Sequence, residues 1–135
     1  MDRTLILVKP DAFERGLTGE VIARFERKGL KIVAMKHMTV DRPLAEAHYA
    51  EHRGKPFYAD LVEFITSGPL VPMVLEGYEA VTAARQVIGA TNPLEAAPGS
   101  LRGDFGLEVQ NNLVHGADST ESAARETALF FPELS

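Results

Sequence analysis

A histidine at the junction between a predicted strand and a predicted helix constrains this chain more than any other feature. Leu113 and Val114 form a short apolar run that ends at His115. Gly116 follows and permits a sharp turn, because glycine has no Cβ and accepts positive φ. We therefore expect His115 to stand at the end of a strand, where the chain turns into a helix.

The helix after this turn offers the histidine a partner. Asp118 or Ser119 can cap its first turn, and Glu121 lies three residues after Asp118, as in a capping box. Glu126 lies on the same helix, and its carboxylate can reach back to the imidazole. A carboxylate that orients a histidine fixes its tautomer and makes the second nitrogen more basic. The pattern suits a nucleophile or general base at His115, although a histidine at a strand end can also be purely structural.

Composition narrows the class of protein. A chain of 135 residues has the length of one domain, spanning 1–135, that can bury a core. The net charge of −5 argues against a general nucleic-acid binder, but a few cations in one pocket suffice for a nucleotide. Without cysteine there are no disulfides and no thiol chemistry. No apolar run reaches the length of a membrane span or secretory signal, so we expect a soluble cytoplasmic protein without a membrane partner.

Hydrophobic periodicity predicts alternating strands and helices. Strands are expected at 4–9, within 30–40, at 71–75 and at 113–115, and helices at 18–28, 43–51, 57–65, 79–88 and after 118. Pro72 favours either an edge position for its strand or a place at the beginning of the strand. The stretch from Ala90 to Gln110 lacks periodicity, and loops of that length are usually functional or disordered. The order of elements predicts an α+β fold in which helices cover one face of an antiparallel sheet.

Two short motifs suggest other functions. His48 and His52 frame an H-x-x-E-H pattern, which some zinc proteases use. No third ligand is identifiable in the sequence, so we interpret both histidines as helix-surface positions. Arg102, Gly103 and Asp104 spell a cell-adhesion tripeptide, which we interpret as a coincidence because no secretion signal is apparent.

The sequence resembles the nucleoside diphosphate kinase family. The Asn-x-x-His-Gly-x-Asp-Ser pattern around His115 is similar to the active-site signature of that family, and three further motifs occur in the family's order, at 8–11, 66–69 and 102–104. The resemblance covers essentially the whole chain and implies a ferredoxin-like βαββαβ core. It also implies transfer of the γ-phosphoryl group of a nucleoside triphosphate, mainly ATP, to a nucleoside diphosphate. The expected mechanism is ping-pong, through a phosphohistidine at His115.

The resemblance also implies roles for individual residues. The catalytic set is His115, Glu126 and Lys9, and the nucleotide-binding set is Lys9, Tyr49, Phe57, Arg85, Thr91, Arg102 and Asn112. Phe57 is expected to stack on the base, which gives affinity with little discrimination between bases. Mg²⁺ is the expected cofactor, held by phosphates and water rather than by direct protein ligands, with Asp118 or Asp11 touching its hydration shell.

Two further expectations follow from the family pattern. The chain is expected to form a homo-oligomer, with a hexamer favoured over a tetramer, through the segment from Ala90 to Gln110 and the apolar tail at Phe130 and Phe131. Ala117 stands where most members have serine, whose hydroxyl can bond the glutamate that orients the histidine. Glu126 must therefore be satisfied by His115, by backbone or by water.

Two other functions stay open at this point. A phosphorelay protein would carry phosphate on His115 between proteins, but such carriers commonly expose the histidine on a helix bundle. A binding module without enzyme activity would bind nucleotides or proteins and form no phosphoenzyme. Labelling by ATP without a partner kinase separates the enzyme from both.

Overall fold

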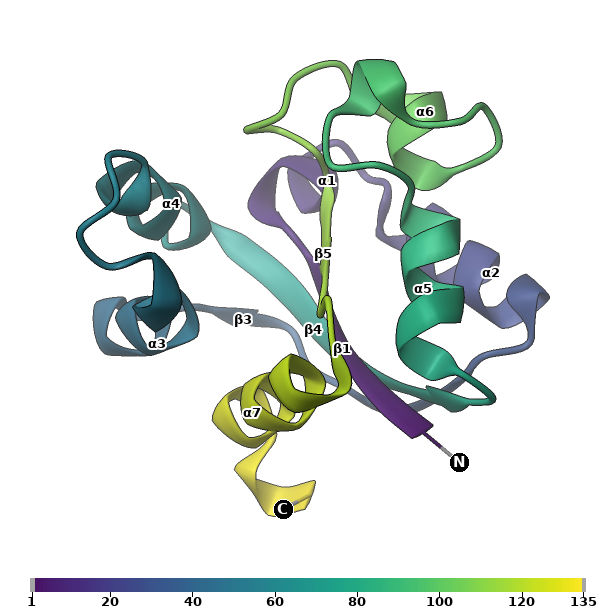
Figure 1. Cartoon of the computed structure of the whole chain (residues 1–135), viewed down its shortest axis with the longest axis horizontal. Coiled ribbons are helices and arrows are strands. Elements are labelled where there is room, and N and C mark those ends of the chain that lie inside the picture. The colour runs from purple at the N-terminus through teal and green to yellow at the C-terminus, as the bar shows by residue number, and fades with distance from the viewer. Residues whose placement is uncertain (1, 135) are drawn as a thin grey trace.

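An antiparallel sheet runs through the middle of the computed structural model, which describes residues 2–134 (Figure 1). Its strand order is β2-β4-β1-β5, and every neighbouring pair is antiparallel. The strands are β1 (Asp2–Val8), β2 (Lys31–Met35), β3 (Met38–Thr39), β4 (Pro69–Gly77) and β5 (Val114–Gly116), of which β3 pairs with β4 beyond β2. This arrangement confirms the predicted ferredoxin-like α+β fold.

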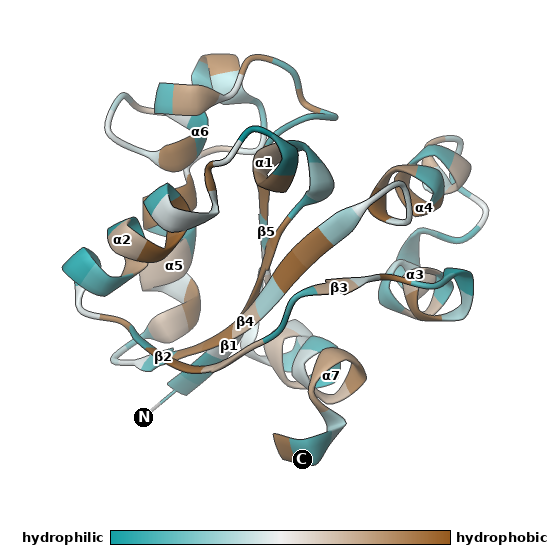
Figure 2. Cartoon of the chain, turned by 180° about the vertical axis from the view of Figure 1, so that it is seen from behind, coloured by the Kyte–Doolittle hydropathy of each residue, from teal (hydrophilic) through white to brown (hydrophobic). Residues whose placement is uncertain are grey.

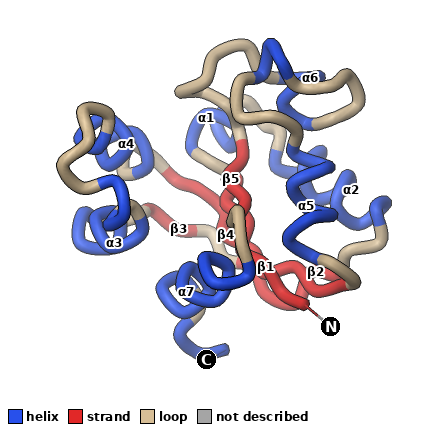
Figure 3. Tube along the Cα trace, in the orientation of Figure 1, coloured by secondary structure: helices blue, strands red, loops and turns tan. Residues whose placement is uncertain are grey.

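Helices connect the strands (Figure 3). They are α1 (Pro10–Glu14), α2 (Thr18–Lys28), α3 (Arg42–His48), α4 (Tyr58–Ile65), α5 (Ala80–Ile88), α6 (Leu101–Phe105) and α7 (Thr120–Phe130), with 3₁₀ turns η1 (Ala50–His52), η2 (Pro93–Glu95) and η3 (Pro132–Leu134). The sequence predicted the longer ones closely. Helix α2, for example, ends at Gly29, whose φ of 103° is the left-handed conformation that glycine adopts readily at a helix end.

Both faces of the sheet are covered, so the expectation of helices on one face was wrong (Figure 2). In β1, Ile6 and Val8 point into a core formed with α2 and α5, whereas Leu5 and Leu7 point into a second core formed with α3, α4 and the end of α7. All four side chains are fully buried. A strand that is apolar on consecutive residues requires cover on both faces, because its side chains alternate between them.

Strand β4 lies in the interior of the sheet and Pro72 is its fourth residue, so neither the edge position nor the strand beginning that Pro72 suggested is found. Pro72 is opposite Leu7 of β1, and its carbonyl accepts a hydrogen bond of 3.0 Å from the N–H of Lys36. Lys36 lies in the short break between β2 and β3. Because the N–H and C=O of a strand residue point to the same side, the missing N–H of proline faces this break and interrupts no regular ladder.

The segment from Ala90 to Gln110 contains more structure than its composition predicted. The hydroxyl of Ser100 accepts a hydrogen bond from Gly103 N–H and caps α6, and Arg24 of α2 forms a 2.9 Å ion pair with Asp104. Asp104 also accepts a 2.8 Å hydrogen bond from Gly99 N–H, while Arg102 is buried. The cell-adhesion tripeptide is thus part of the internal packing of this segment.

The apolar tail folds back onto the protein's own body. Phe130 and Phe131 are 2% and 1% exposed and belong to the second core. The Lys36 ammonium donates to the Phe130 carbonyl at 2.7 Å and lies 4.6 Å from the centre of the Phe131 ring. These two rings therefore leave no apolar surface for a neighbouring subunit. Within residues 2–134, no helix is long and apolar enough to cross a membrane.

Candidate active site

A strained turn presents His115. Leu113, two residues earlier, has a φ of 76°, which is unusual for a residue with a side chain. The turn is held from both sides, since Leu113 N–H donates to Asp11 Oδ2 at 3.1 Å and Leu113 C=O accepts from Lys9 N–H at 2.9 Å. Backbone strain of this kind persists only where surrounding contacts fix it, and it is common at functional sites.

Gly116 serves a different purpose from the one that the sequence suggested. Its φ is not positive; the left-handed residue nearby is Leu113, in the turn that precedes β5. A Cβ on Gly116 would lie 2.6 Å from Cδ1 of Ile88 on α5. Glycine is therefore needed for the close approach of β5 to α5, which brings Arg85 of α5 within 3.0 Å of the Gly116 carbonyl.

Ser119 caps helix α7, which leaves Asp118 available for other contacts. The Ser119 hydroxyl accepts a 3.1 Å hydrogen bond from Ser122 N–H. Asp118 is exposed and lines the cleft that contains His115. Of the two caps that the sequence allowed, the structure uses the serine.

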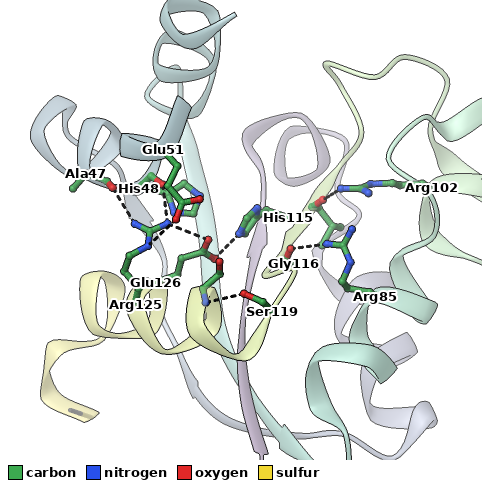
Figure 4. Close-up of polar contacts among 12 residues, drawn as sticks. Ala47, His48, Glu51, Arg85, Arg102, His115, Gly116, Ser119, Arg125 and Glu126 are labelled. Atoms are coloured by element: carbon green, nitrogen blue, oxygen red, sulfur yellow. Dashed lines mark hydrogen bonds and ion pairs between the residues drawn. The ribbon is translucent and has the colours of Figure 1, made fainter. Parts of the chain in front are cut away.

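Glu126 of α7 holds the imidazole of His115 (Figure 4). Its Oε1 lies 2.7 Å from His115 Nε2, and the glutamate is almost completely buried. A carboxylate only accepts hydrogen bonds, so Nε2 carries the hydrogen and Nδ1 keeps its lone pair. The pair therefore presents Nδ1 as a nucleophile.

Arg125, which no sequence motif pointed to, supports Glu126. Its Nη2 lies 3.7 Å from Glu126 Oε2, so the second carboxylate oxygen faces a positive charge. Its guanidinium also donates to the Ala47 carbonyl at 3.2 Å and the His48 carbonyl at 3.5 Å. Arg125 thereby ties α7 to the end of α3 across the site. The only feature of the sequence that pointed to this role is that Arg125 directly precedes Glu126.

His115 opens into a cleft of about 380 Å³. The cleft brings together every residue of the predicted site except Phe57, namely Lys9, Tyr49, Arg85, Thr91, Arg102, Asn112, His115 and Glu126. Phe57 is 46% exposed and lies just outside, where its ring centre is 5.4 Å from that of His52, a lining residue. The cleft thus has a positively charged floor and an aromatic ring at its rim.

Lys9 lies at the floor of the cleft. Its ammonium donates to Asn112 Oδ1 at 2.6 Å, and Asn112 Nδ2 donates in turn to the Thr91 carbonyl at 3.0 Å. Burial lowers the pKa of Lys9 from 10.5 to about 8; the nearby Asp11 carboxylate partly offsets this, and Arg102 adds to it. The ammonium group of Lys9 therefore loses its proton more readily than that of an exposed lysine, and a negatively charged ligand in the cleft would favour its charged form.

The two arginines also build the walls of the site. Arg102 donates to three backbone carbonyls, those of Asn112 at 3.1 Å, Gly89 at 3.2 Å and Val114 at 2.6 Å. Burial, and then the neighbouring Arg85, lower the pKa of Arg102 to about 10. Arg102 therefore fixes the strand that carries His115 as well as adding charge. Tyr49 is also mostly buried, and burial followed by the charge of Glu126 raises its pKa to about 12.

His48 is buried against His115, so its assignment to the helix surface was wrong. The two ring centres are 4.7 Å apart in an edge-to-face arrangement. Burial, followed by the proximity of His115 and Arg125, lowers the pKa of His48 well below 6.5. One sequence signal was available, since His48 follows Leu44 by four residues and Ala45 by three, a spacing that puts all three on one side of α3.

Comparison with known proteins identifies the family. The sequence model described as "Nucleoside diphosphate kinase" matches residues 2–135. The chain belongs to the nucleoside diphosphate kinase family. A nucleoside diphosphate kinase of Parafrankia sp. (strain EAN1pec) is 66% identical over 134 residues, which cover 99% of this chain and 98% of the relative. One from Archaeoglobus fulgidus is 61% identical over 133 residues, 98% of this chain and 88% of the relative.

Solved structures agree with this assignment. A nucleoside diphosphate kinase family protein from Babesia bovis superposes with a TM-score of 0.96 at 49% identity, over 98% of this chain and 90% of that chain. A halophilic nucleoside diphosphate kinase from Halobacterium salinarum, solved in complex with CDP, gives a TM-score of 0.94 at 51% identity, over 96% and 87%. The chain is accordingly a phosphotransferase that acts on nucleoside di- and triphosphates.

Proposed function

We propose that His115 is the covalent carrier of a ping-pong reaction in a single domain, 1–135. Nδ1 attacks the γ-phosphorus of a nucleoside triphosphate, the bond from that phosphorus to the β,γ-bridging oxygen breaks, and the diphosphate leaves. A terminal oxygen of the acceptor diphosphate then attacks the same phosphorus, and the phosphorus–nitrogen bond breaks. The observation that carries this proposal is the 2.7 Å contact between His115 Nε2 and Glu126, which keeps the Nδ1 lone pair available.

The cations of the cleft stabilise charge on the transferred group. Phosphoryl transfer depends mainly on positioning and electrostatic stabilisation. Lys9, Arg85 and Arg102 line the cleft that contains His115. Each guanidinium uses some N–H groups on carbonyls, and arginine has five donors, so others stay available for phosphate oxygens. Tyr49 and Thr91 contribute hydroxyls, and Asn112 contacts the sugar side.

Asp118 fits the expected Mg²⁺ better than Asp11 does. Asp118 is exposed and lines the cleft, whereas Asp11 Oδ2 is engaged by the Leu113 N–H and does not line it. Mg²⁺ keeps most of its water shell and binds phosphate oxygens, and it neutralises phosphate charge when bound. Asp118 would accept hydrogen bonds from that shell rather than bind the ion directly.

The nucleoside extends from the phosphates toward Phe57 at the rim. The Halobacterium relative in complex with CDP supports a nucleoside diphosphate in this cleft. The Lys55 ammonium lies 5.8 Å from the Phe57 ring centre, and this cation–π contact helps to fix the position of the ring. Because the ring stacks on any base, the enzyme accepts all common nucleosides.

The functional form is a homo-oligomer, with a hexamer favoured over a tetramer, in the cytoplasm. The support comes from the segment between α5 and β5, where Leu94 and Leu107 are each 74% exposed and Val109 is 53% exposed. Burial of these side chains against a second subunit would remove their apolar surface from water. Light scattering at micromolar concentration should give a multiple of 14.7 kDa, and a single subunit mass would contradict the assembly.

Incubation of the purified protein with γ-labelled ATP and Mg²⁺ tests the function directly. The expected product is one label per subunit that is stable to base and labile to acid, and that passes to added diphosphates. His115→Ala should form no labelled protein yet still bind ADP, whereas the control His37→Ala, which changes an exposed histidine, should label normally. Binding without label in the unmodified protein would support the binding module, and label that passes only to another protein would support the phosphorelay.

A further inference from the structure

Three potential metal ligands converge beside the nucleophile. His48 comes from the end of α3, His115 from β5 and Glu126 from α7 (Figure 4). One ligand atom from each lies within 4.8 Å of the other two. Two imidazoles and one carboxylate form a donor set that suits a zinc-like ion, with water in a fourth position.

His48 has ring nitrogens that the proposed phosphoryl transfer does not use. Both Nδ1 and Nε2 are buried, and neither has a hydrogen-bond partner within the described residues 2–134. Buried polar groups are nearly always satisfied, so such a ring calls for a physical explanation. Its neighbours are the rings of Tyr49, His115 and Phe130, which fix its position but satisfy neither nitrogen.

We propose that His48, His115 and Glu126 form an inhibitory site for a divalent cation of the zinc class. Imidazole nitrogens suit Zn²⁺, Cu²⁺ and Ni²⁺, whereas Mg²⁺ prefers oxygen ligands. The site is therefore distinct in chemistry from the nucleotide-bound magnesium. The H-x-x-E-H motif contributes only one of its histidines, because His52 turns toward Phe57 and Lys55 instead.

Small movements bring the donors into coordination geometry. Zinc ligands lie about 2.0–2.1 Å from the ion, so two donors on a tetrahedral ion are about 3.4 Å apart. The widest pair in the cluster must therefore close by at most about 1.4 Å, given its 4.8 Å limit. The His115 Nε2 and Glu126 Oε1 atoms, now 2.7 Å apart, must open by about 0.7 Å. The open cleft on one side of the cluster provides the access route and room for the water ligand.

Binding of the cation removes the nucleophile. Nε2 of His115, which faces Glu126, becomes the metal-binding nitrogen and loses its hydrogen to solvent. Nδ1 of the neutral ring then takes up a hydrogen, so no net proton is released and the Nδ1 lone pair is no longer available. The ring can no longer accept a phosphoryl group, and Glu126 no longer orients it. A zinc-class ion is therefore expected to prevent phosphoenzyme formation while Mg²⁺ supports it.

Calorimetric titration of the unphosphorylated full-length protein with Zn²⁺ alone tests the site without reference to kinase activity. We expect one ion per subunit, not displaced by millimolar Mg²⁺. His48→Gln should weaken binding at least tenfold, and Glu126→Gln should do the same. The matched control His52→Gln, which changes the other histidine of the motif, should stay within about twofold. Unchanged affinity in His48→Gln, loss of binding in His52→Gln, or no binding below millimolar Zn²⁺ would each overturn the proposal.

A measurement on the unmodified protein guards against variants that fail to fold. X-ray absorption of the zinc-loaded wild type should give two imidazole ligands with the remaining ligands oxygen. The chain has four histidines, so zinc bound at random to surface groups would give a number of imidazole ligands that varies between preparations. Fewer than two imidazoles would contradict the site. Zn²⁺ should also block labelling by γ-labelled ATP over the same concentration range as it binds, and labelling that persists at saturation would show that the bound ion does not inhibit.

Discussion

Oε1 of Glu126 lies 2.7 Å from Nε2 of His115, and this contact joins the central residue of β5 to the middle of helix α7. The other carboxylate oxygen, Oε2, faces Arg125 at 3.7 Å. Each carboxylate oxygen of Glu126 therefore has a partner, a hydrogen bond at Oε1 and a longer ion pair at Oε2. The serine that most family members have at position 117 is not needed to satisfy this carboxylate.

Ala117→Ser should raise kcat by no more than about tenfold. A hydrogen bond to a charged group contributes about 1.5–3 kcal/mol, which would correspond to roughly ten- to a hundredfold in rate if all of it acted on the barrier. We expect less, because His115 and Arg125 already hold Glu126. Steady-state kinetics with ATP and a diphosphate acceptor measures the effect. A gain above a hundredfold would show that the natural chain is an impaired or repurposed member of the family.

Nucleotide affinity should fall as the pH rises above about 8. Burial lowers the pKa of Lys9 to about 8 in the free protein. Phosphate favours the charged form and raises this pKa in the complex, so affinity is complete below the free pKa and declines above it. The decline reaches at most about tenfold per pH unit, because one proton is involved.

Calorimetric titration with ADP between pH 7 and 9.5 measures this dependence. Lys9→Met should bind ADP weakly at every pH and lose the decline. The control Lys31→Met, which removes an exposed lysine at the start of β2, should keep the wild-type profile. A decline of unchanged size in Lys9→Met would assign the titration to another group.

All four common bases should be accepted, with kcat/KM values within about two orders of magnitude, or roughly 2.7 kcal/mol. Phe57 supplies a stacking surface that does not read base edges. Phe57→Ala should lower the affinity for every nucleotide by a similar factor of about five- to a hundredfold, since stacking contributes about 1–3 kcal/mol per base. Tyr78→Ala, at an aromatic residue that is 86% exposed, is the matched control. Strict selectivity for one base would reveal a polar contact that reads it.

Gly103→Ala should destabilise the segment that carries Arg102. A Cβ at position 103 would lie 2.1 Å from the Ala97 carbonyl oxygen, a backbone atom that cannot move without shifting the segment. Overpacking of this kind costs about 1–3 kcal/mol in free energy of unfolding. Gly19→Ala on α2 meets nothing within 4 Å and should instead stabilise the protein by about 0.5–1 kcal/mol. Urea unfolding of both variants measures the difference, and equal stabilities would contradict the steric argument.

Local patterns in the sequence were enough to predict much of the fold. The apolar run of β1, the periodicity of α2 and its termination at Gly29 are encoded by neighbouring residues, because side-chain alternation and helical spacing are properties of short segments. The family resemblance added the residues of the cleft, of which all but Phe57 line it. The expected contact between His115 and Glu126 is present because both lie within one strand–turn–helix unit.

Contacts between distant segments could not be predicted in this way. Whether Pro72 lies at an edge depends on where β2 breaks, and the left-handed turn falls at Leu113 rather than at Gly116 because Asp11 and Lys9 hold it across about a hundred residues. The family resemblance predicted that Arg102 binds phosphate. Its hydrogen bonds to three backbone carbonyls show that it also holds β5 in place.

The sequence by itself determined the longer helices and strands of this protein, the nature of its nucleophile and the carboxylate that orients it, because these depend on spacing along a short stretch of chain. Only the tertiary structure decided the environment of that nucleophile. It buried His48 against His115 and placed Arg125 between Glu126 and the end of α3. The physical reason is that burial and charge at a site are set by which segments pack together, and no local pattern records the neighbours that a residue meets after folding.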